Sequence, residues 1–366
     1  MASLGTDDSV RLMRQITKFR AQQLRVVSHP HARYLYDLVR HYNGAVPRTL
    51  TYRPAASELA RIDESFNASS QGEALQRRDD LAPETHQPMN GVSTPVSAQG
   101  KVTSWVSPGA GILWVSAAST HDLGQAGTPR AYRERDISSE TWFSPIQHPR
   151  LLSDDVHPAP FRVGDVISTS SVPAWGDSGG HVGVVWTTGN TSKVSLYQGS
   201  RLLGESADEQ FVNADDLSPA PLPYKVVVEG NRDQANRPYS TRTLTEWAFN
   251  SSSTNSEARS PLPLIQLDYA VATDLSGKAD RRTPLGITPS QFEGATGAGA
   301  IHTVRLDVSY DDSATWHTSS LRQSHTTWKA SLDAPSKAKF VSLRTSARDV
   351  HGNRVSQTLI RAFGIR

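Results

Sequence analysis

Short runs of alternating apolar and polar residues dominate the second half of the chain. Between residues 341 and 348, Val, Leu, Thr and Ala alternate with Ser and Arg, so one face of this segment is expected to be buried and the other wet. Comparable short runs, separated by Pro, Gly and Asp, occur at 102–106, 112–117, 140–143, 165–169, 181–187, 193–197, 224–229, 241–249, 264–271, 301–310, 315–322, 327–332, 339–348 and 354–363. Many short strands at this spacing predict a mainly β protein.

The first hundred residues have a weaker pattern. Val10, Met13, Ile16 and Phe19 recur at three-residue steps with basic residues between them, which predicts an amphipathic packing helix within 7–27. A membrane-surface helix, or a strand over 21–27, is the alternative. Asn-Gly at 43–44, between β-prone runs at 34–42 and 46–52, predicts a hairpin. A short helix is expected at 57–64 and an irregular connection at 65–100, which is poor in apolar clusters.

The polar segment Asn250–Pro261 is the best domain boundary in the chain, because its composition is that of a flexible linker. We therefore expect an N-terminal segment at 1–53, a β-sandwich or jelly-roll-like domain at 54–255, and a β-sandwich of immunoglobulin or fibronectin type III size at 261–366. Charge follows the same division, with net values of +6, −8 and +4 for residues 1–53, 54–260 and 261–366.

Composition excludes several kinds of chemistry. The 366 residues include no cysteine, which rules out disulfides, thiolate nucleophiles and Cys-ligated metal sites. A net charge of +2 gives no indication of a nucleic-acid partner. No apolar run approaches the roughly 18 residues of a membrane span, and no signal peptide follows Met1.

Gly176-Asp-Ser-Gly-Gly180 spells the nucleophile motif of trypsin-like peptidases, in which a serine needs an imidazole base held by a carboxylate. His121 lies only 57 positions upstream of Ser178, too close for a trypsin-type pair of barrels. A glycine-rich connection between strands explains the motif better, because glycine accepts positive φ and Asp and Ser cap local amides. No catalytic residue is therefore expected.

The alternative is a self-sufficient serine hydrolase built on Ser178. In that hypothesis His121 or His181 is the base, and Asp177 or Asp155 orients it.

Other chemistry has less support. The chain contains no His-Glu-x-x-His helix, no phosphate-binding loop and no nucleotide fingerprint, so neither cofactor nor metal is expected. Acidic pairs at 79–80, 154–155 and 215–216 are expected to be solvated, with structural calcium as the alternative. Tryptophans can pack in sandwich cores or form an exposed sugar-stacking platform, which would make the protein a carbohydrate-binding module; they stand at positions 105, 114, 142, 175, 186, 247, 316 and 328.

Two segments predict structural turns. Residues 309–316 follow an Asp-box pattern with Ser313 in place of glycine, so Ser309 and Asp311 should bind the turn while Trp316 packs beneath it. Asp349, Gly352 and Asn353 predict a second hairpin turn, since Gly and Asn tolerate positive φ.

Together these residues resemble a known family. Leu306–Asp312 with Thr315-Trp316, Phe340–Arg344 and Gln357–Phe363 are similar to the terminal domain of large secreted subtilisin-like (S8) serine peptidases of streptomycetes and other actinobacteria. Further matches are less specific and occur at 50–54, 142–150, 165–183 and 196–204. The resemblance covers residues 34–366.

The resemblance implies an accessory, non-catalytic C-terminal β region of an exported peptidase. The family's Asp, His and Ser motifs belong to a subtilisin domain, and none occurs in this chain. That catalytic domain, in cis, is then the expected partner, together with protein substrate or cell-surface material. The chain would be a fragment of such a peptidase or a stand-alone relative, and the missing signal peptide favours the fragment. Extracellular localisation follows from the same resemblance.

Overall fold

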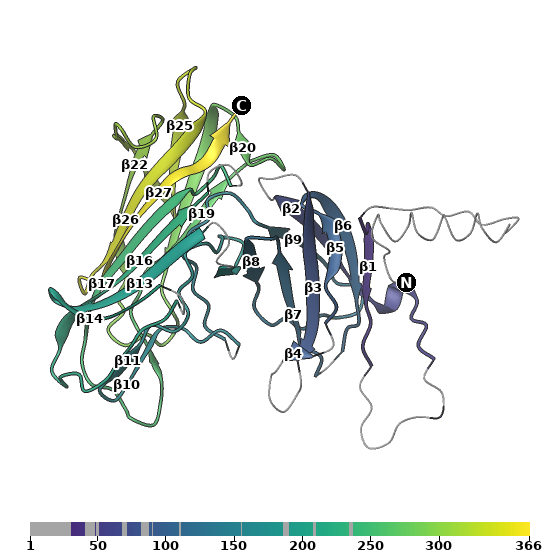
Figure 1. The fold of residues 1–366 in the computed structure, drawn as a ribbon, viewed down its shortest axis with the longest axis horizontal. Coiled ribbons are helices and arrows are strands. Elements are labelled where there is room, and N and C mark those ends of the chain that lie inside the picture. The colour runs from purple at the N-terminus through teal and green to yellow at the C-terminus, as the bar shows by residue number, and fades with distance from the viewer. Residues whose placement is uncertain are drawn as a thin grey trace, which may run out of the picture.

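The fold is almost entirely β structure, and the mainly β prediction is confirmed (Figure 1). This computed structural model describes residues 31–40, 48, 51–67, 72–81, 88–89, 91–109, 111–154, 156–185, 190–207, 210–233 and 237–366. The helix predicted within 7–27 and the Asn-Gly turn at 43–44 lie outside these residues.

Two sheets form an N-terminal body. One has the strand order β1-β6-β2-β9, formed by β1 (Tyr34–Asp37), β6 (Gln99–Val106), β2 (Ala60–Asn67) and β9 (Ile137–Trp142). The other has the order β12-β8-β7-β3-β4, with β5 also paired to β3; its strands are β12 (Val182–Val185), β8 (Leu123–Ala126), β7 (Trp114–Ser119), β3 (Glu73–Leu81), β4 (Pro88–Met89) and β5 (Thr94–Ser97). Apolar side chains from both sheets, among them Ile62 and Trp114, pack together between them.

Two predictions for this body are wrong, and the hairpin at 34–52 stays a prediction because its turn lies outside the described residues. Of its two runs, Tyr34–Asp37 pair in parallel with β6, and residues 51–52 are not in a strand. The helix expected at 57–64 is a 3₁₀ turn (Ala56–Glu58) followed by β2, whose residues alternate between buried and half-buried. The connection expected at 65–100 contains β3 and β5.

A nine-stranded sheet forms the C-terminal body. Its path is β14-β13-β16-β17-β27-β26-β22-β23, with β20 attached to β27. The bounds are β14 (Arg201–Ser206), β13 (Asn190–Gln198), β16 (Leu222–Arg232), β17 (Arg242–Ser251), β27 (Arg354–Ile365), β26 (Phe340–Asp349), β22 (Ile301–Ser309), β23 (His317–Ser319) and β20 (Lys278–Ala279).

Two smaller sheets accompany this one. The order β19-β21-β25-β24 is formed by β19 (Gln266–Val271), β21 (Arg282–Ser290), β25 (Thr327–Asp333) and β24 (Arg322–Ser324). The order β15-β11-β10-β18 is formed by β15 (Asn213–Ala214), β11 (Val166–Ser168), β10 (Phe161–Val163) and β18 (Ser260–Pro261). The indole of Trp247, on β17, donates a hydrogen bond of 2.8 Å to the carbonyl of Ile265 just before β19, so the large sheet and β19 pack together.

The large sheet continues across the predicted boundary at 255–261. β17 precedes this segment and β27 follows it, yet they are hydrogen-bonded neighbours over seven residue pairs from Arg242↔Ile360 to Ala248↔Arg354. Ser260 and Pro261 themselves pair with β10. The polar segment that predicted a linker therefore connects β17 of the large sheet to β18 of a smaller sheet, and the large sheet continues with strands on both sides of it.

Candidate functional site

The Gly176–Gly180 loop lies where the two bodies meet, in the connection between β11 and β12. Gly176 pairs with His148 and Asp177 with His181 through isolated bridges. A Cβ atom on Gly176 would lie 2.4 Å from the His181 carbonyl oxygen, and one on Gly183 would lie 2.4 Å from that of Trp175. These glycines are required because backbones approach closely here.

The hydroxyl of Ser178 forms two hydrogen bonds. Its Oγ is 3.0 Å from Nε2 of His148 and 2.7 Å from the backbone nitrogen of Tyr269, at the edge of β19. Nδ1 of His148 is 2.9 Å from the carbonyl oxygen of Pro149, an acceptor that requires a proton on Nδ1. Nε2 is then unprotonated, so the serine hydroxyl donates to His148 and accepts from Tyr269.

His148 is a buried, neutral imidazole. Its side chain is completely inaccessible to solvent. Burial lowers the pKa of His148 to about 4, against a smaller upward effect of the Pro149 carbonyl. At neutral pH this histidine has a free lone pair directed at Ser178, as a general base would.

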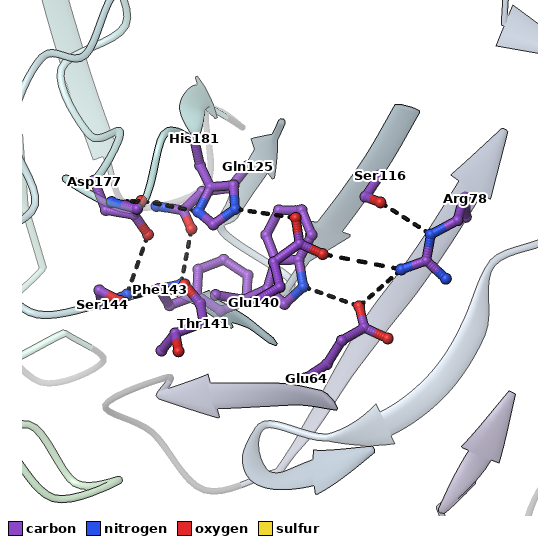
Figure 2. Close-up of polar contacts among 12 residues, drawn as sticks. Glu64, Arg78, Ser116, Gln125, Glu140, Thr141, Phe143, Ser144, Asp177 and His181 are labelled. Carbon is purple, nitrogen blue, oxygen red and sulfur yellow. Dashed lines mark hydrogen bonds and ion pairs between the residues drawn. The ribbon is translucent and has the colours of Figure 1, made fainter. Parts of the chain in front are cut away.

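Asp177 faces the other histidine, as Figure 2 shows. Its Oδ1 is 2.8 Å from Nδ1 of His181 and accepts the amide of Gly179 at 2.9 Å, while Oδ2 accepts the amide of Ser144 at 3.2 Å. Nε2 of His181 is 3.5 Å from Oε1 of Glu140. Asp177 therefore binds His181 and the local backbone, and not the imidazole that Ser178 contacts.

His181 is held as a cation. Burial alone would lower its pKa, but the carboxylates of Asp177 and Glu140 raise the pKa of His181 to about 10. The ring also stacks on Trp142, with 4.1 Å between ring centroids. With both nitrogens engaged and the proton retained, His181 is not a general base for Ser178.

The ion pairs continue into the N-terminal body. Arg78 on β3 is inaccessible to solvent and donates to Glu64 at 3.1 Å, to Asp37 at 2.6 Å and to Ser116 at 3.0 Å. Its guanidinium is also 3.9 Å from Glu140. Asp177, His181, Glu140, Arg78 and Glu64 thus form one row, which we call the ionic chain (Figure 2).

Burial raises the pKa of Glu64, although Arg78 acts in the opposite direction. Glu64 also accepts hydrogen bonds from the hydroxyl of Ser104 and the indole nitrogen of Trp142. Both carboxylate oxygens of Glu64 therefore have hydrogen-bond partners, which is the condition for stable buried charge. Oε2 of Glu140 has no hydrogen-bond partner in the described part of the chain and contacts Arg78 only as an ion pair at 3.9 Å.

The other candidates named from the sequence do not meet Ser178. The His121 side chain is 58% exposed and lies 3.6 Å from Asp122, which is bound in turn by Arg237. Asp155 lies outside the described residues. His148, the actual neighbour of Ser178, has no signal in the sequence beyond its place in a His-Pro-Arg run, because the pairing depends on the bridge between Gly176 and His148.

A cleft of about 1010 Å³ opens beside Ser178. The serine and Gly179 line it together with the end of β19 and the residues that follow, 269–275. Ser65 and Asn67 of β2 and Thr141 of β9 lie on the side of the N-terminal body. The cleft is therefore bounded by both bodies.

The two predicted turns are held by carboxylates. Asp311 accepts the amide of Thr315 at 2.9 Å, and Ser309 accepts that of Ser313 at 2.9 Å. Trp316 is half-buried, with the Arg344 guanidinium 4.3 Å from its ring centroid.

Asp349 accepts backbone hydrogen bonds from His351, Asn353 and Gly299. Gly352 has a φ of 90°, in the left-handed region that glycine accepts. Burial would raise the pKa of Asp349, but the hydrogen bonds from Asn353 and Gln291 leave it lowered.

Most described tryptophans are core residues. Trp114, Trp142, Trp175, Trp247 and Trp328 are buried, Trp105 and Trp316 are half-buried, and Trp186 lies outside the described residues. Within the described ranges, no group of three or more His, Asp or Glu side chains is arranged to hold a metal ion. Nor does this part of the chain contain a helix long and apolar enough to span a membrane.

No protein-family model matches the chain. No curated protein matches it either. Among solved structures, the fibronectin(III)-like modules of Clostridium thermocellum CbhA are similar to it at 11% identity and a TM-score of 0.17, covering 60% of this chain and 92% of that chain. The FN1–FN3 domains of chicken CNTN1 align at 9% identity and a TM-score of 0.16, covering 81% of this chain and 95% of that chain. Native E. coli alpha-2-macroglobulin aligns at 12% identity and a TM-score of 0.18, covering 84% of this chain and 22% of that chain.

Proposed function

We propose that this chain is the accessory C-terminal β region of an exported subtilisin-like serine peptidase, which stabilises the enzyme and holds protein substrate. The segments that resemble that family support the proposal because they are neighbours in space. Leu306–Asp312, Phe340–Arg344 and Gln357–Phe363 lie on and beside β22, β26 and β27, three adjacent strands of the large sheet.

The geometry of the Gly176–Gly180 loop favours a structural role for the motif. Asp177 binds His181, and Ser178 links the imidazole of His148 to the backbone of Tyr269 at the edge of β19. A trypsin-type mechanism needs a carboxylate on the histidine that activates the serine, and here a backbone carbonyl has that place.

The proposal is tested with the purified chain and casein. We expect the chain to bind unfolded casein without hydrolysing it, and to lengthen the half-life of a subtilisin-type catalytic domain fused in front of it. A fusion with an unrelated β-sandwich of similar size is the control. Casein hydrolysis by the chain that Ser178→Ala abolishes would overturn the proposal, as would absence of both casein binding and stabilisation.

The contact between Ser178 and His148 supports a second candidate, a serine hydrolase. Its base would be His148, whose Nε2 is 3.0 Å from Oγ, and the Pro149 carbonyl would fix the imidazole tautomer. In such a reaction Ser178 Oγ attacks an acyl carbon and its proton passes to His148, which returns it to the leaving group; water then releases the acyl group.

A fluorophosphonate probe distinguishes the two candidates. If the chain is a hydrolase, the probe labels Ser178 of the wild type, and His148→Gln prevents this labelling. Thermal unfolding checks that the variant is folded. If the chain is an accessory region, the folded wild type is not labelled, because the Ser178 hydroxyl is held between His148 and Tyr269.

A further inference from the structure

β19 is an edge strand of its sheet, so the backbone groups on one of its two sides do not face β21. In the antiparallel pair β19–β21, Leu267 lies opposite Pro289, which has no N–H to donate. This position is therefore a non-hydrogen-bonded pair, in which the backbone groups of both residues point away from the partner strand. Because the pattern repeats every two residues, Tyr269 and Val271 also direct their N–H and C=O groups outward from β21.

The hydrogen bond to Ser178 agrees with this register. The amide of Tyr269 donates to Ser178 Oγ and not to β21. Two residues further, the amide of Val271 faces the same way. In the part of the chain that the structure describes, the Val271 amide donates to no backbone group outside the β19–β21 pair, and Val271 is half-exposed on the wall of the cleft.

The cleft continues along this edge. Ala270, Ala272 and Thr273 line it after Tyr269, with small side chains that leave the backbone accessible. An unpaired strand edge beside an open cleft is a template for another extended chain.

The described residues that line the cleft include three charged side chains, Asp274 and two lysines. The Asp274 carboxylate accepts the Ser276 amide and lies 3.3 Å from the Arg366 guanidinium, so the lysines indicate which kind of chain would fit. Lys101 of β6 lies on the N-terminal body and Lys329 of β25 on the C-terminal one, and both line the cleft and are exposed. In the part of the chain that the structure describes, neither ammonium group has an ion-pair partner. A segment lying between them gains from acidic side chains.

We propose that the outward edge of β19, centred on Val271, binds an extended polypeptide segment with acidic side chains by strand addition. The proposal rests on the function proposed above and names the site at which substrate is held. Backbone hydrogen bonds to Val271 supply the strand pairing, while Lys101 and Lys329 select for carboxylates.

The test uses a fluorescent peptide of about ten residues that alternates Val and Thr with Glu, measured by fluorescence anisotropy. Val271→Pro removes the N–H group that points away from β21. Because of the strand register, this substitution removes no hydrogen bond between β19 and β21. We expect it to weaken binding about 3- to 10-fold, the equivalent of one hydrogen bond. Val271→Ala is the matched control and should bind like wild type. Lys101→Ala with Lys329→Ala should weaken binding further and reduce its salt dependence.

A second series needs only the wild-type protein, in case Val271→Pro fails to fold. N-methylation of the peptide at alternate residues removes the N–H groups of one edge at a time. Strand addition predicts that one set of methylated peptides loses binding and the other keeps it. Equal binding by both sets, or by Val271→Pro and wild type, overturns the site. Casein binding that survives Val271→Pro would reject this site while leaving the proposed function standing.

Discussion

The two bodies of this protein fill their interiors with different chemistry. The large sheet of the C-terminal body is centred on apolar residues such as Val226, Leu343 and Leu359, all completely buried. In the N-terminal body, the buried face of β3 carries Gln76 and Arg78, and the ionic chain lies between the sheets. The apolar interior tolerates gradual loss of contacts, whereas the ionic one depends on every partner being present.

Arg78→Ala is expected to have the largest effect. Removing the guanidinium leaves Glu64 buried without its cation and Asp37 without its ion pair, which should lower the free energy of unfolding by about 3–5 kcal/mol. Urea denaturation measures this loss. Arg282→Ala is the control: its side chain is 85% exposed, so the change should stay within about 0.5 kcal/mol. A loss as small for Arg78 as for Arg282 would remove the distinction between the two interiors.

Leu359→Ala tests the apolar interior. The side chain is completely buried on β27, and its removal should cost about 2–5 kcal/mol through lost burial and the cavity left behind. Leu244→Ala, at a position 37% exposed, should cost much less in the same urea experiment. Similar values for the two leucines would mean that β27 is not the centre of the large sheet's core.

The two histidines beside Ser178 sharpen the comparison through pH. His148 has a folded pKa of about 4, below the unfolded value of about 6.5, so its neutral form stabilises the fold above pH 6.5 and this contribution is lost as the pH falls toward 4. His181 has a folded pKa of about 10, so its contribution is complete below pH 6.5 and is lost as the pH rises toward 10.

Thermal unfolding of His148→Gln and His181→Gln between pH 5 and 9 measures these opposite slopes. His181→Gln should lower Tm more at pH 6 than at pH 9, because the imidazolium that it removes contributes most to folding stability at the lower pH. His148→Gln should reduce the fall in Tm between pH 6.5 and 5. Parallel curves for both variants and wild type would contradict the assigned protonation states.

The contrast between the bodies also explains what the sequence could predict. Alternating apolar residues at 341–348 predict β26, because burial there follows hydrophobicity. β3 was missed since its buried positions include Gln76, Arg78 and Asp80, whose polarity resembles that of a loop. The β17–β27 pairing was also not predictable, because it joins residues more than 100 positions apart and no local pattern encodes that contact.

The site was predictable to a smaller extent. The glycine-rich loop was expected as a turn, and the hydrolase alternative included Asp177 as the residue that orients His181; the two are in fact paired. It did not include His148 as the histidine that contacts Ser178. His148 meets Ser178 only because a backbone bridge aligns residues 148 and 176. Sequence spacing carries no information about such a bridge, whereas the residue types that can donate and accept protons are visible in the sequence.

The position of β27 has a consequence for how the chain is made. This strand is the last of its sheet to be synthesised, yet it lies between β17 and β26. Until it emerges, β17 and β26 each present an unpaired edge, and the growing chain contains two half-sheets that cannot join. Closure of the sheet is therefore a late, long-range event, and the interval before it is when the nascent protein is most exposed to aggregation.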